Sequence, residues 1–302
     1  MLGSTVTVAA KRAAFRADLA SGRLLRLPGA FSPLVARIVQ ETGFDGVYIS
    51  GAALSADQAL PDIGLTTLSE VAARGGAIAQ ATDLPALVDA DTGFGEPLNV
   101  ARTTRVLEQA GLAGLHLEDQ VNPKRCGHLD HKAVVSTADM VGRLRAAVDA
   151  RTDPSFVICA RTDARTVEGL GAAIDRAKAY VDAGADMIFA EAIADESELA
   201  AFRAAVDVPL LANMTEFGKS PLLDVATLER LGVNVVIYPV TTLRIAMGAV
   251  EAGLRTIAAE GTQSSIVPAM QTRARLYELL DYADYTQFDS SVFNFTAGGA
   301  DR

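Results

Sequence analysis

Four carboxylates and one arginine stand at the ends of short apolar runs in this sequence. They are Asp89, Asp91, Glu118, Glu191 and Arg161. Carboxylates brought together without compensation repel one another and raise their pKa values, so a divalent cation is their natural partner. The candidate ligands are all oxygen donors, and the His and Cys set of a zinc centre does not accompany them. The pattern therefore predicts a hard cation, Mg²⁺ or Mn²⁺.

A second reactive segment, Lys124–His128, has the sequence K-R-C-G-H. Pro123 and Gly127 flank it and predict an exposed, mobile loop. The thiol of Cys126 stands beside cationic side chains, which lower a thiol pKa and make it chemically competent. Taken alone, Cys126 is equally compatible with an incidental surface thiol, and Lys124 and Arg125 with a solvated pair. Cys159 lies among apolar neighbours and is expected to be inert core.

Eight apolar runs, each followed by a helical pattern, must position these side chains. The expected strands are Leu24–Gly29, Gly46–Ser50, Ala86–Asp91, Gly114–Asp119, Phe156–Thr162, Met187–Glu191, Pro209–Asn213 and Val235–Pro239. Helical stretches between them include Val100–Ala110, Thr137–Ala150, Leu170–Ala183 and Ser197–Val206. Alternating strands and helices predict a parallel sheet, and eight units match an α/β (β/α)₈ TIM barrel. A doubly wound open sheet is the alternative, but no G-x-G-x-x-G fingerprint follows the first strand.

Active sites of such barrels lie at the carboxyl ends of the strands, so the polar strand ends are the informative positions. Alternation along a strand predicts that Asp89 and Asp91 share a face, as do Glu118 and His116. Any one of them taken alone is compatible with a capping or ion-paired residue. Tyr48 shares a face with Ser50 and is a candidate for proton transfer, with a core tyrosine as the alternative.

Two helical segments fall outside the eightfold pattern, at residues 4–21 and 264–285. The second carries an apolar stripe of Met270, Leu276, Leu279 and Leu280. Such helices would cap the barrel or pack on another subunit. We find no linker, charge block or low-complexity segment. The expectation is a single domain, residues 1–302, with an N-terminal helix in residues 1–22 and a C-terminal helical extension in residues 262–302.

The composition narrows the class of protein. The 302 residues are 50% hydrophobic, enough for one large core, and no run approaches the ~18 apolar residues of a membrane span. A net charge of −10 argues against nucleic acid or an anionic membrane as the main partner. Two cysteines and a polar N-terminal stretch without a secretory pattern predict a cytoplasmic location.

Several separated motifs resemble the isocitrate lyase/phosphoenolpyruvate mutase superfamily. They are V-D-A-D-T-G-F-G at 88–95, G-L-H-L-E-D-Q at 114–120 and K-R-C-G-H at 124–128. That cysteine loop, with A-R-T-D-A at 160–164 and N-M-T-E-F-G at 213–218, is most similar to the 2-methylisocitrate lyases of the superfamily. The similarity runs from about Leu27 to Tyr277, with motifs that agree in order and spacing.

The resemblance implies a carbon–carbon lyase that cleaves 2-methylisocitrate to pyruvate and succinate. It implies retro-aldol chemistry with Mg²⁺ as cofactor, for which Mn²⁺ can substitute, in propionate breakdown by the methylcitrate cycle. It also implies a di- or tricarboxylate substrate and a homotetramer that exchanges C-terminal helices. Alternatives within the superfamily are isocitrate lyase and 2,3-dimethylmalate lyase, with oxaloacetate hydrolases and phosphonate-processing enzymes further away. A non-catalytic carboxylate-binding relative is the alternative outside enzymes.

Carried over by motif, the metal site is Asp89, Asp91, Asp62 and Glu118, held partly through water. The predicted catalytic residues are Cys126, Arg161, Glu118 and Tyr48. The predicted substrate-binding residues are Ser50, Gly51, Ala52, Lys124, Arg125, Gly127, His128, His116, Glu191, Asn213, Thr215, Phe189, Ile237 and Arg273. Ala52 and Ala190 depart from the usual glycine and proline of the family, and neither change removes a chemical group.

The chemistry fits these residue types independently. A bound cation acts as Lewis acid on a 2-hydroxyl, and Cys126 is a suitable general acid for the succinate carbanion. Phe189 and Ile237 are candidates for an apolar wall beside the substrate methyl group, and barrel core packing is the alternative for both. Such a wall favours a buried methyl by roughly 1 kcal/mol.

Overall fold

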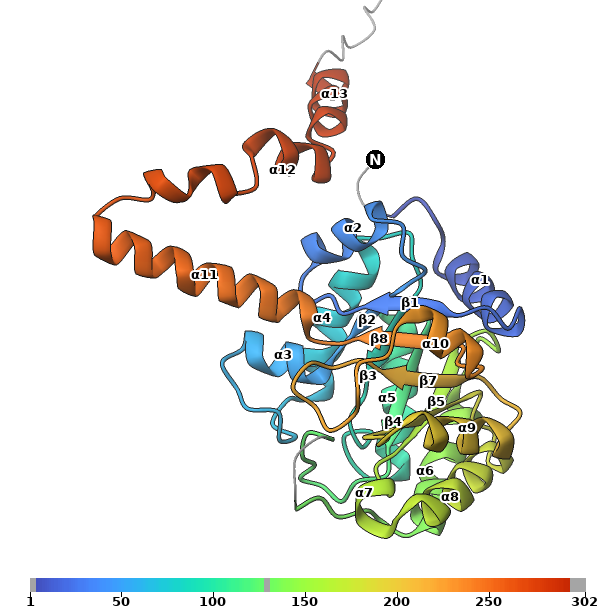
Figure 1. Ribbon diagram of the computed structural model, residues 1–302. Helices are drawn as coiled ribbons and strands as arrows, with labels where there is room; N and C mark the ends of the chain where they lie inside the picture. Colours follow the sequence, from blue (N-terminus) through green and yellow to red (C-terminus); the bar gives the residue numbers. More distant parts are fainter. Residues whose placement is uncertain (1–3, 128–130, 294–302) are drawn as a thin grey trace, which may run out of the picture.

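The chain forms a barrel of eight parallel strands surrounded by helices (Figure 1). The structure is a computed structural model that describes residues 4–127 and 131–293. Neighbouring strands follow the order β1-β8-β7-β6-β5-β4-β3-β2, and a bridge between Gly29 and Tyr48 joins β1 to β2. This closure confirms the predicted (β/α)₈ barrel and excludes the open sheet.

The strands lie within one or two residues of their expected bounds. They are β1 Leu25–Pro28, β2 Val47–Ile49, β3 Ala86–Asp89, β4 Gly114–Glu118, β5 Val157–Thr162, β6 Met187–Ala190, β7 Leu210–Asn213 and β8 Val235–Tyr238. The difference that bears on function is at β3, which ends at Asp89 rather than at Asp91. Asp91 has a φ of 47°, in the left-handed region, and so cannot continue the strand.

The helices mostly occupy the connections between strands. Around the barrel they are α1 Val8–Ala20, α2 Pro33–Glu41, α3 Gly51–Asp57, α4 Leu68–Gln80, α5 Pro97–Gln109, α6 Thr137–Ala150, α7 Arg165–Glu168, α8 Leu170–Asp182, α9 Glu196–Ala205 and α10 Val225–Arg230. Beyond β8 follow α11 Thr241–Glu260, the 3₁₀ helix η1 Ser264–Ala269, α12 Arg273–Leu279 and α13 Tyr282–Phe293. No helix in the described part of the chain combines the length and apolar character needed to cross a membrane.

Two layers of apolar side chains form the core because strand residues alternate in direction. The outer layer packs strands against helices, for example Ile49 and Val88. The inner layer fills the barrel with Leu27, Leu87 and Met187. Helix α1 covers the amino ends of the strands, and its Phe15 joins the inner layer. The barrel is therefore filled below the level at which the polar strand ends lie.

The C-terminal arm, residues 241–293, leaves the barrel along α11 (Figure 1). The prediction of one helix over 264–285 is wrong: the segment is broken into η1, α12 and the start of α13. Pro268 lies inside η1, and Asp281, between α12 and α13, has a φ of 53°. The predicted stripe does not form one buried face, since Leu279 is buried and Met270 and Leu280 are exposed. Arg37 of α2 donates to the Leu279 carbonyl at 2.7 Å, which ties the far part of the arm to the barrel.

Candidate active site

A pocket opens at the carboxyl ends of the strands. Its wall contains the predicted residues Tyr48, Ser50, Ala52, Asp62, Asp89, Cys126, Gly127, Arg161, Phe189, Glu191, Asn213 and Thr215. Pro239, Val240 and Arg244 complete it. Residues from at least six strand ends and their loops therefore converge, as expected for a barrel of this type.

Asp89 and Asp91 come together by a different route from the one expected. Strand alternation does not apply, because Asp91 lies beyond the strand end. Its left-handed backbone turns the chain so that its amide donates to Asp89 Oδ1 at 3.0 Å, and its carbonyl accepts from the Glu118 amide at 2.9 Å. Both carboxylates face Gly51, where an added Cβ would lie 2.9 Å from Asp89 Oδ2 and 3.4 Å from Asp91 Oδ1. The glycine thus leaves space beside two carboxylates.

Lys124 is buried, which rules out for this residue the alternative of an exposed, solvated pair. The residue is 3% exposed, and its ammonium contacts Asp62 and lies 2.9 Å from Asp91 Oδ1. Burial alone would lower the lysine pKa, but Asp91, Glu118 and Asp62 raise it well above its usual value. Burial, with Asp89 and Asp62 nearby, raises the pKa of Asp91 to about 6 against the effect of Lys124. Lys124 therefore acts as an internal counter-charge to the acidic cluster.

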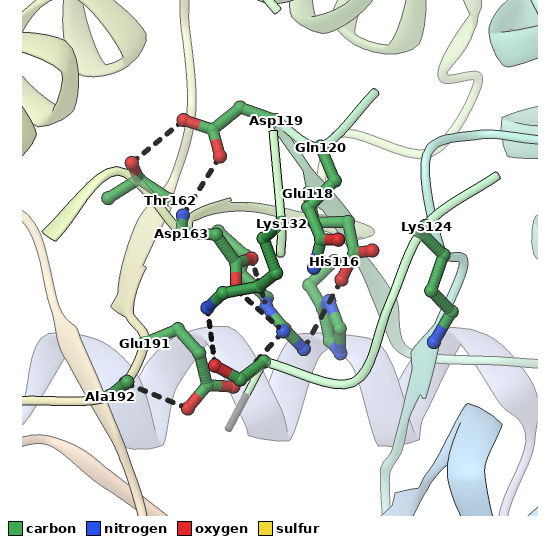
Figure 2. A network of polar contacts seen from close by, with 12 residues as sticks. His116, Glu118, Asp119, Gln120, Lys124, Lys132, Thr162, Asp163, Glu191 and Ala192 are labelled. Atoms are coloured by element: carbon green, nitrogen blue, oxygen red, sulfur yellow. Dashed lines mark hydrogen bonds and ion pairs between the residues drawn. The ribbon is translucent and has the colours of Figure 1, made fainter. Parts of the chain in front are cut away.

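Three buried carboxylates, those of Glu118, Asp163 and Glu191, share contact with Arg161, and Figure 2 shows these three residues near one another. The Arg161 guanidinium lies 3.3 Å from Glu118, 2.9 Å from Asp163 and 3.2 Å from Glu191, and its Cζ lies 5.1 Å from the centroid of the Phe189 ring. Both oxygens of Glu118 are buried and accept no hydrogen bond from the residues that the structure describes. Burial raises the pKa of Glu118 well above its usual value. Such a carboxylate still has acceptor capacity for a cation or for metal-bound water.

Tyr48 and His116 form a neutral pair beneath the pocket. The Tyr48 hydroxyl lies 2.7 Å from His116 Nε2, and both side chains are buried. Burial raises the pKa of Tyr48 well above 10 and lowers the pKa of His116 to about 4. Tyr48 reaches the pocket wall, whereas His116 supports it from behind. The tyrosine is therefore a core residue by burial and a site residue by position.

The cysteine segment, residues 124–127, lies against the arginine cluster. Cys126 is half-buried and lines the pocket, and Gly127 is buried. A Cβ on Gly127 would collide with the Arg161 guanidinium and the Glu191 side chain, so only glycine fits there. Arg125 turns toward the backbone carbonyls of Pro123 and Lys124 instead of the pocket. The predicted site residue His128 lies outside the described residues.

Two further predicted residues do not reach the pocket wall. Ile237 packs in the inner barrel layer, as its alternative interpretation expected. Arg273 is exposed at the start of α12, because the arm carries it away from the barrel. Three charged residues of the site region were not predicted. Asp163 stood in a quoted motif, Arg244 follows the last strand, and Lys132 has no local signal because its partners are distant in sequence.

A direct metal site is not preformed. In the described ranges no three His, Cys, Asp or Glu side chains converge on one point closely enough to hold an ion. The acidic cluster is nevertheless crowded: Asp62, Asp89, Asp91, Glu118, Asp163 and Glu191 stand against the cations Lys124, Lys132 and Arg161. The unbonded oxygens of Glu118 and the space at Gly51 are compatible with a hard cation bound partly through water.

A barrel with a pocket of charged side chains at the carboxyl ends of its strands is typical of enzymes. The sequence profile of the phosphoenolpyruvate phosphomutase family matches residues 15–258, and the chain belongs to this family, within the phosphoenolpyruvate mutase/isocitrate lyase superfamily.

Individual relatives agree with this assignment. The chain is 62% identical to "Probable 2-methylisocitrate lyase 2" of Corynebacterium glutamicum over 98% of this chain and 97% of that protein. A crystal structure of 2,3-dimethylmalate lyase superposes with a TM-score of 0.88 at 32% identity, covering 99% of this chain and all of that one. Phosphonopyruvate hydrolase in complex with oxalate and Mg²⁺ gives a TM-score of 0.85 at 32% identity, covering 93% and 98%. The predicted superfamily is confirmed. The predicted enzyme class, a carbon–carbon lyase, is confirmed as well, since the first two of these relatives are named as lyases of that class.

Proposed function

We propose that this chain cleaves 2-methylisocitrate to pyruvate and succinate by a Mg²⁺-dependent retro-aldol reaction, as a step of propionate catabolism through the methylcitrate cycle. The observation that carries the proposal is one pocket that combines a crowded carboxylate cluster with a thiol and an arginine. The name of the Corynebacterium relative, at high identity over nearly the full length, supports this substrate. The proposal includes a cytoplasmic location, since Cys126 and Cys159 are not joined in a disulfide.

The residues present fit a divalent cation. Asp89 and Asp91 would hold it beside Gly51, partly through water, with Asp62 and Glu118 nearby. A bound Mg²⁺ would polarise the 2-hydroxyl and the neighbouring carboxylate of the substrate. The acidic surplus supports this role, because an anionic substrate would otherwise meet more carboxylates than cations. The Mg²⁺ in the structure of the related phosphonopyruvate hydrolase is a further support.

The rest of the pocket would orient the carboxylates of the substrate. Ser50 and Ala52 line the pocket, and the Gly51 amide between them donates to Asp89, so we place the pyruvate half here. Asn213 and Thr215 line the pocket at and beyond the end of β7, where the succinyl carboxylate would lie. Arg161 contacts Glu118 and Glu191 and would screen the negative charge that develops during cleavage.

The protons balance with groups of this chain. The 2-hydroxyl loses its proton, the C–C electron pair moves to the carbon that becomes the succinate methylene, and that carbon must gain a proton. Cys126 lines the pocket and would donate the S–H proton. Tyr48 would accept the proton of the substrate hydroxyl as it passes its own proton to His116 Nε2, which lies 2.7 Å away. After the products leave, the proton held by His116 would return through Tyr48 and reprotonate the Cys126 thiolate.

A coupled assay tests the proposal by comparing 2-methylisocitrate, isocitrate and 2,3-dimethylmalate, each with Mg²⁺ and with excess chelator. We expect the highest kcat/KM for 2-methylisocitrate, with activity abolished by chelator and restored by Mg²⁺ or Mn²⁺. Equal or better cleavage of either other substrate would move the assignment within the superfamily. Full turnover without metal would overturn the metal-dependent mechanism.

We extend the proposal to assembly as a homo-oligomer, a tetramer with exchanged C-terminal helices. The arm exposes large apolar side chains that a solitary chain would leave in water, namely Ile245, Met247, Val250, Leu254, Ile257, Val267, Met270, Tyr277, Leu280, Tyr282, Tyr285, Phe288 and Val292. Arg273 would then serve the pocket of a second copy. Truncation after Gly261 should abolish the oligomer in light scattering, and a stable active monomer would contradict the assembly. The single domain, residues 1–302, stays a prediction.

A further inference from the structure

Lys132 joins the cysteine segment to the arginine cluster. Its ammonium donates to the Gly127 carbonyl. It also donates to Asp163 Oδ1 at 2.8 Å, and Figure 2 shows Lys132 beside Asp163. The side chain of Lys132 is 2% exposed and that of Asp163 is fully buried. A buried ammonium with two such acceptors is a fixed contact, because moving it would leave charged groups unpaired inside the protein.

Asp163 is itself held from two directions. Its carboxylate accepts from Arg161 Nε at 2.9 Å and from Arg161 Nη2 at 3.2 Å, so the pair is bidentate. Its amide donates to Asp119 Oδ1 at 2.8 Å. Asp119 Oδ2 accepts from Thr162 and from Tyr180 of α8, each at 2.8 Å. Asp163 is therefore fixed in position relative to the barrel strands and to α8.

Gly127 completes the connection. Its Cα side lies so close to Arg161 and Glu191 that a Cβ would collide with both, and its carbonyl is held by Lys132. Cys126, the next residue, lines the pocket. The position of the thiol relative to the Arg161 guanidinium is thus set through Gly127, Lys132 and Asp163.

We infer that Lys132 is a positioning residue, which sets the proton-donating thiol of Cys126 at a fixed place relative to Arg161. This inference rests on the proposed function for its effect on turnover. Lys132 does not line the pocket and is assigned no contact with substrate. Its effect should therefore fall on the proton-transfer step rather than on binding.

Lys132→Met tests the inference, because methionine keeps the length of the stem and removes both hydrogen bonds. Lys178→Met is the matched control, since Lys178 is an exposed lysine on α8. We expect kcat of Lys132→Met to fall 10- to 100-fold, with KM within threefold of the unchanged chain. Lys132→Arg, which keeps a buried cation, should recover part of kcat, and Lys178→Met should match the unchanged chain.

Alkylation by iodoacetamide gives a readout that does not depend on turnover. Cys159 is buried in the barrel core, so the reaction reports on Cys126. In Lys132→Met the alkylation rate should rise at least fivefold, because the segment that carries the thiol is released.

Each outcome decides a separate question. Turnover within twofold of the unchanged chain, or a lower kcat with an unchanged alkylation rate, would overturn the positioning role. If Lys132→Met does not fold, Lys132→Arg is subjected to the same two measurements: a partial loss of kcat with faster alkylation would support the inference, and full kcat or an unchanged alkylation rate would overturn it. Failure of the unchanged chain to cleave 2-methylisocitrate would overturn the proposed function alone, since the alkylation comparison still decides the position of the thiol.

Discussion

The two ends of the barrel handle buried charge in opposite ways. At the amino ends of the strands, α1 inserts cations that mostly meet neutral carbonyls: Lys11 donates to Ala79 and Thr82, and Arg12 to Leu112 and Glu108. At the carboxyl ends, Arg161 alone faces three carboxylates, and Lys124 faces two.

The difference shows at which end of the barrel the buried charges are balanced within the chain and at which end they are not. Carbonyl acceptors satisfy a cation without adding net charge, so the amino end is electrostatically complete. The carboxyl end keeps a surplus of negative charge and a Glu118 carboxylate whose oxygens accept no hydrogen bond within the described chain. Substitutions at the amino end should therefore change stability, and substitutions at the carboxyl end should change chemistry.

The largest expected effect is at the thiol. Cys126→Ser should lower kcat by about 10³-fold, because serine is a far weaker acid than a thiol and general acid catalysis contributes on that order. Binding of succinate and the melting temperature should stay unchanged. Cys159→Ser is the contrasting variant: its hydroxyl would be buried in the inner core, so stability should fall and kcat should not. Steady-state kinetics and thermal unfolding of both variants check this pair, and a fully active Cys126→Ser would refute proton donation.

A second large effect is expected at the acidic cluster. Asp91→Asn should lower kcat/KM at least about 10²-fold at saturating Mg²⁺, since the charge that holds the cation is lost. Burial and the neighbouring carboxylates raise the pKa of Asp91 to about 6, so removing its charge should leave the free energy of unfolding equal or higher in metal-free buffer. Urea unfolding with chelator, beside kinetics, measures both. A strongly destabilised variant would show that this end also serves stability.

At the amino end, Arg12→Met should have the opposite signature. Arg12 is 6% exposed, and its loss would remove a charged donor from the Leu112 and Glu108 carbonyls and from Asp153. We expect the free energy of unfolding to fall by about 3 kcal/mol, with kcat unchanged in the folded fraction. Urea unfolding and active-site-normalised kinetics separate the two quantities. A lower kcat with an unchanged free energy of unfolding would contradict the comparison between the two ends of the barrel.

The smallest effect concerns a carboxylate at the amino end that is held by neutral donors. Burial alone would raise the pKa of Asp83, but hydrogen bonds from Ser4, Thr5 and Val6 outweigh it and the pKa is lowered. A carboxyl with a lower pKa in the folded state stabilises above its unfolded pKa, and this contribution is lost as the pH falls through the folded pKa. Asp83→Asn should therefore cost less than about 1 kcal/mol at pH 7, and the cost should be smaller at pH 3. Urea unfolding at both pH values checks the sign, and a larger cost at pH 3 would contradict it.

Some features of this chain were predictable because their cause is local. The eight strands follow from apolar runs, and Asp89, Glu118 and Arg161 followed from their places at strand ends. Cys126 was found because its neighbours in sequence are also its neighbours in space. The break in the arm at Pro268 had a local signal as well, which the apolar stripe outweighed in the prediction.

Other features depend on contacts between distant segments and could not be predicted in this way. The left-handed backbone of Asp91, rather than strand alternation, places its carboxylate. Lys124 is buried because Asp62 and Asp91 surround it, and Lys132 is a site residue only through Asp163 and Gly127. Periodicity describes which way a residue faces within one element and says nothing of which charges meet across elements.

The filled barrel has a kinetic consequence. Because Phe15 and the inner layer occupy the space beneath the pocket, substrate enters and both products leave through the same mouth. Ser50 and Asp89 are buried, whereas Asn213 and Thr215 are half-exposed, so under the proposed placement succinate lies nearer the exit. Succinate should then depart first and pyruvate last. In such an ordered release, pyruvate competes with substrate for the empty enzyme, and succinate inhibits noncompetitively. The product inhibition patterns therefore show which product lies deeper in the pocket.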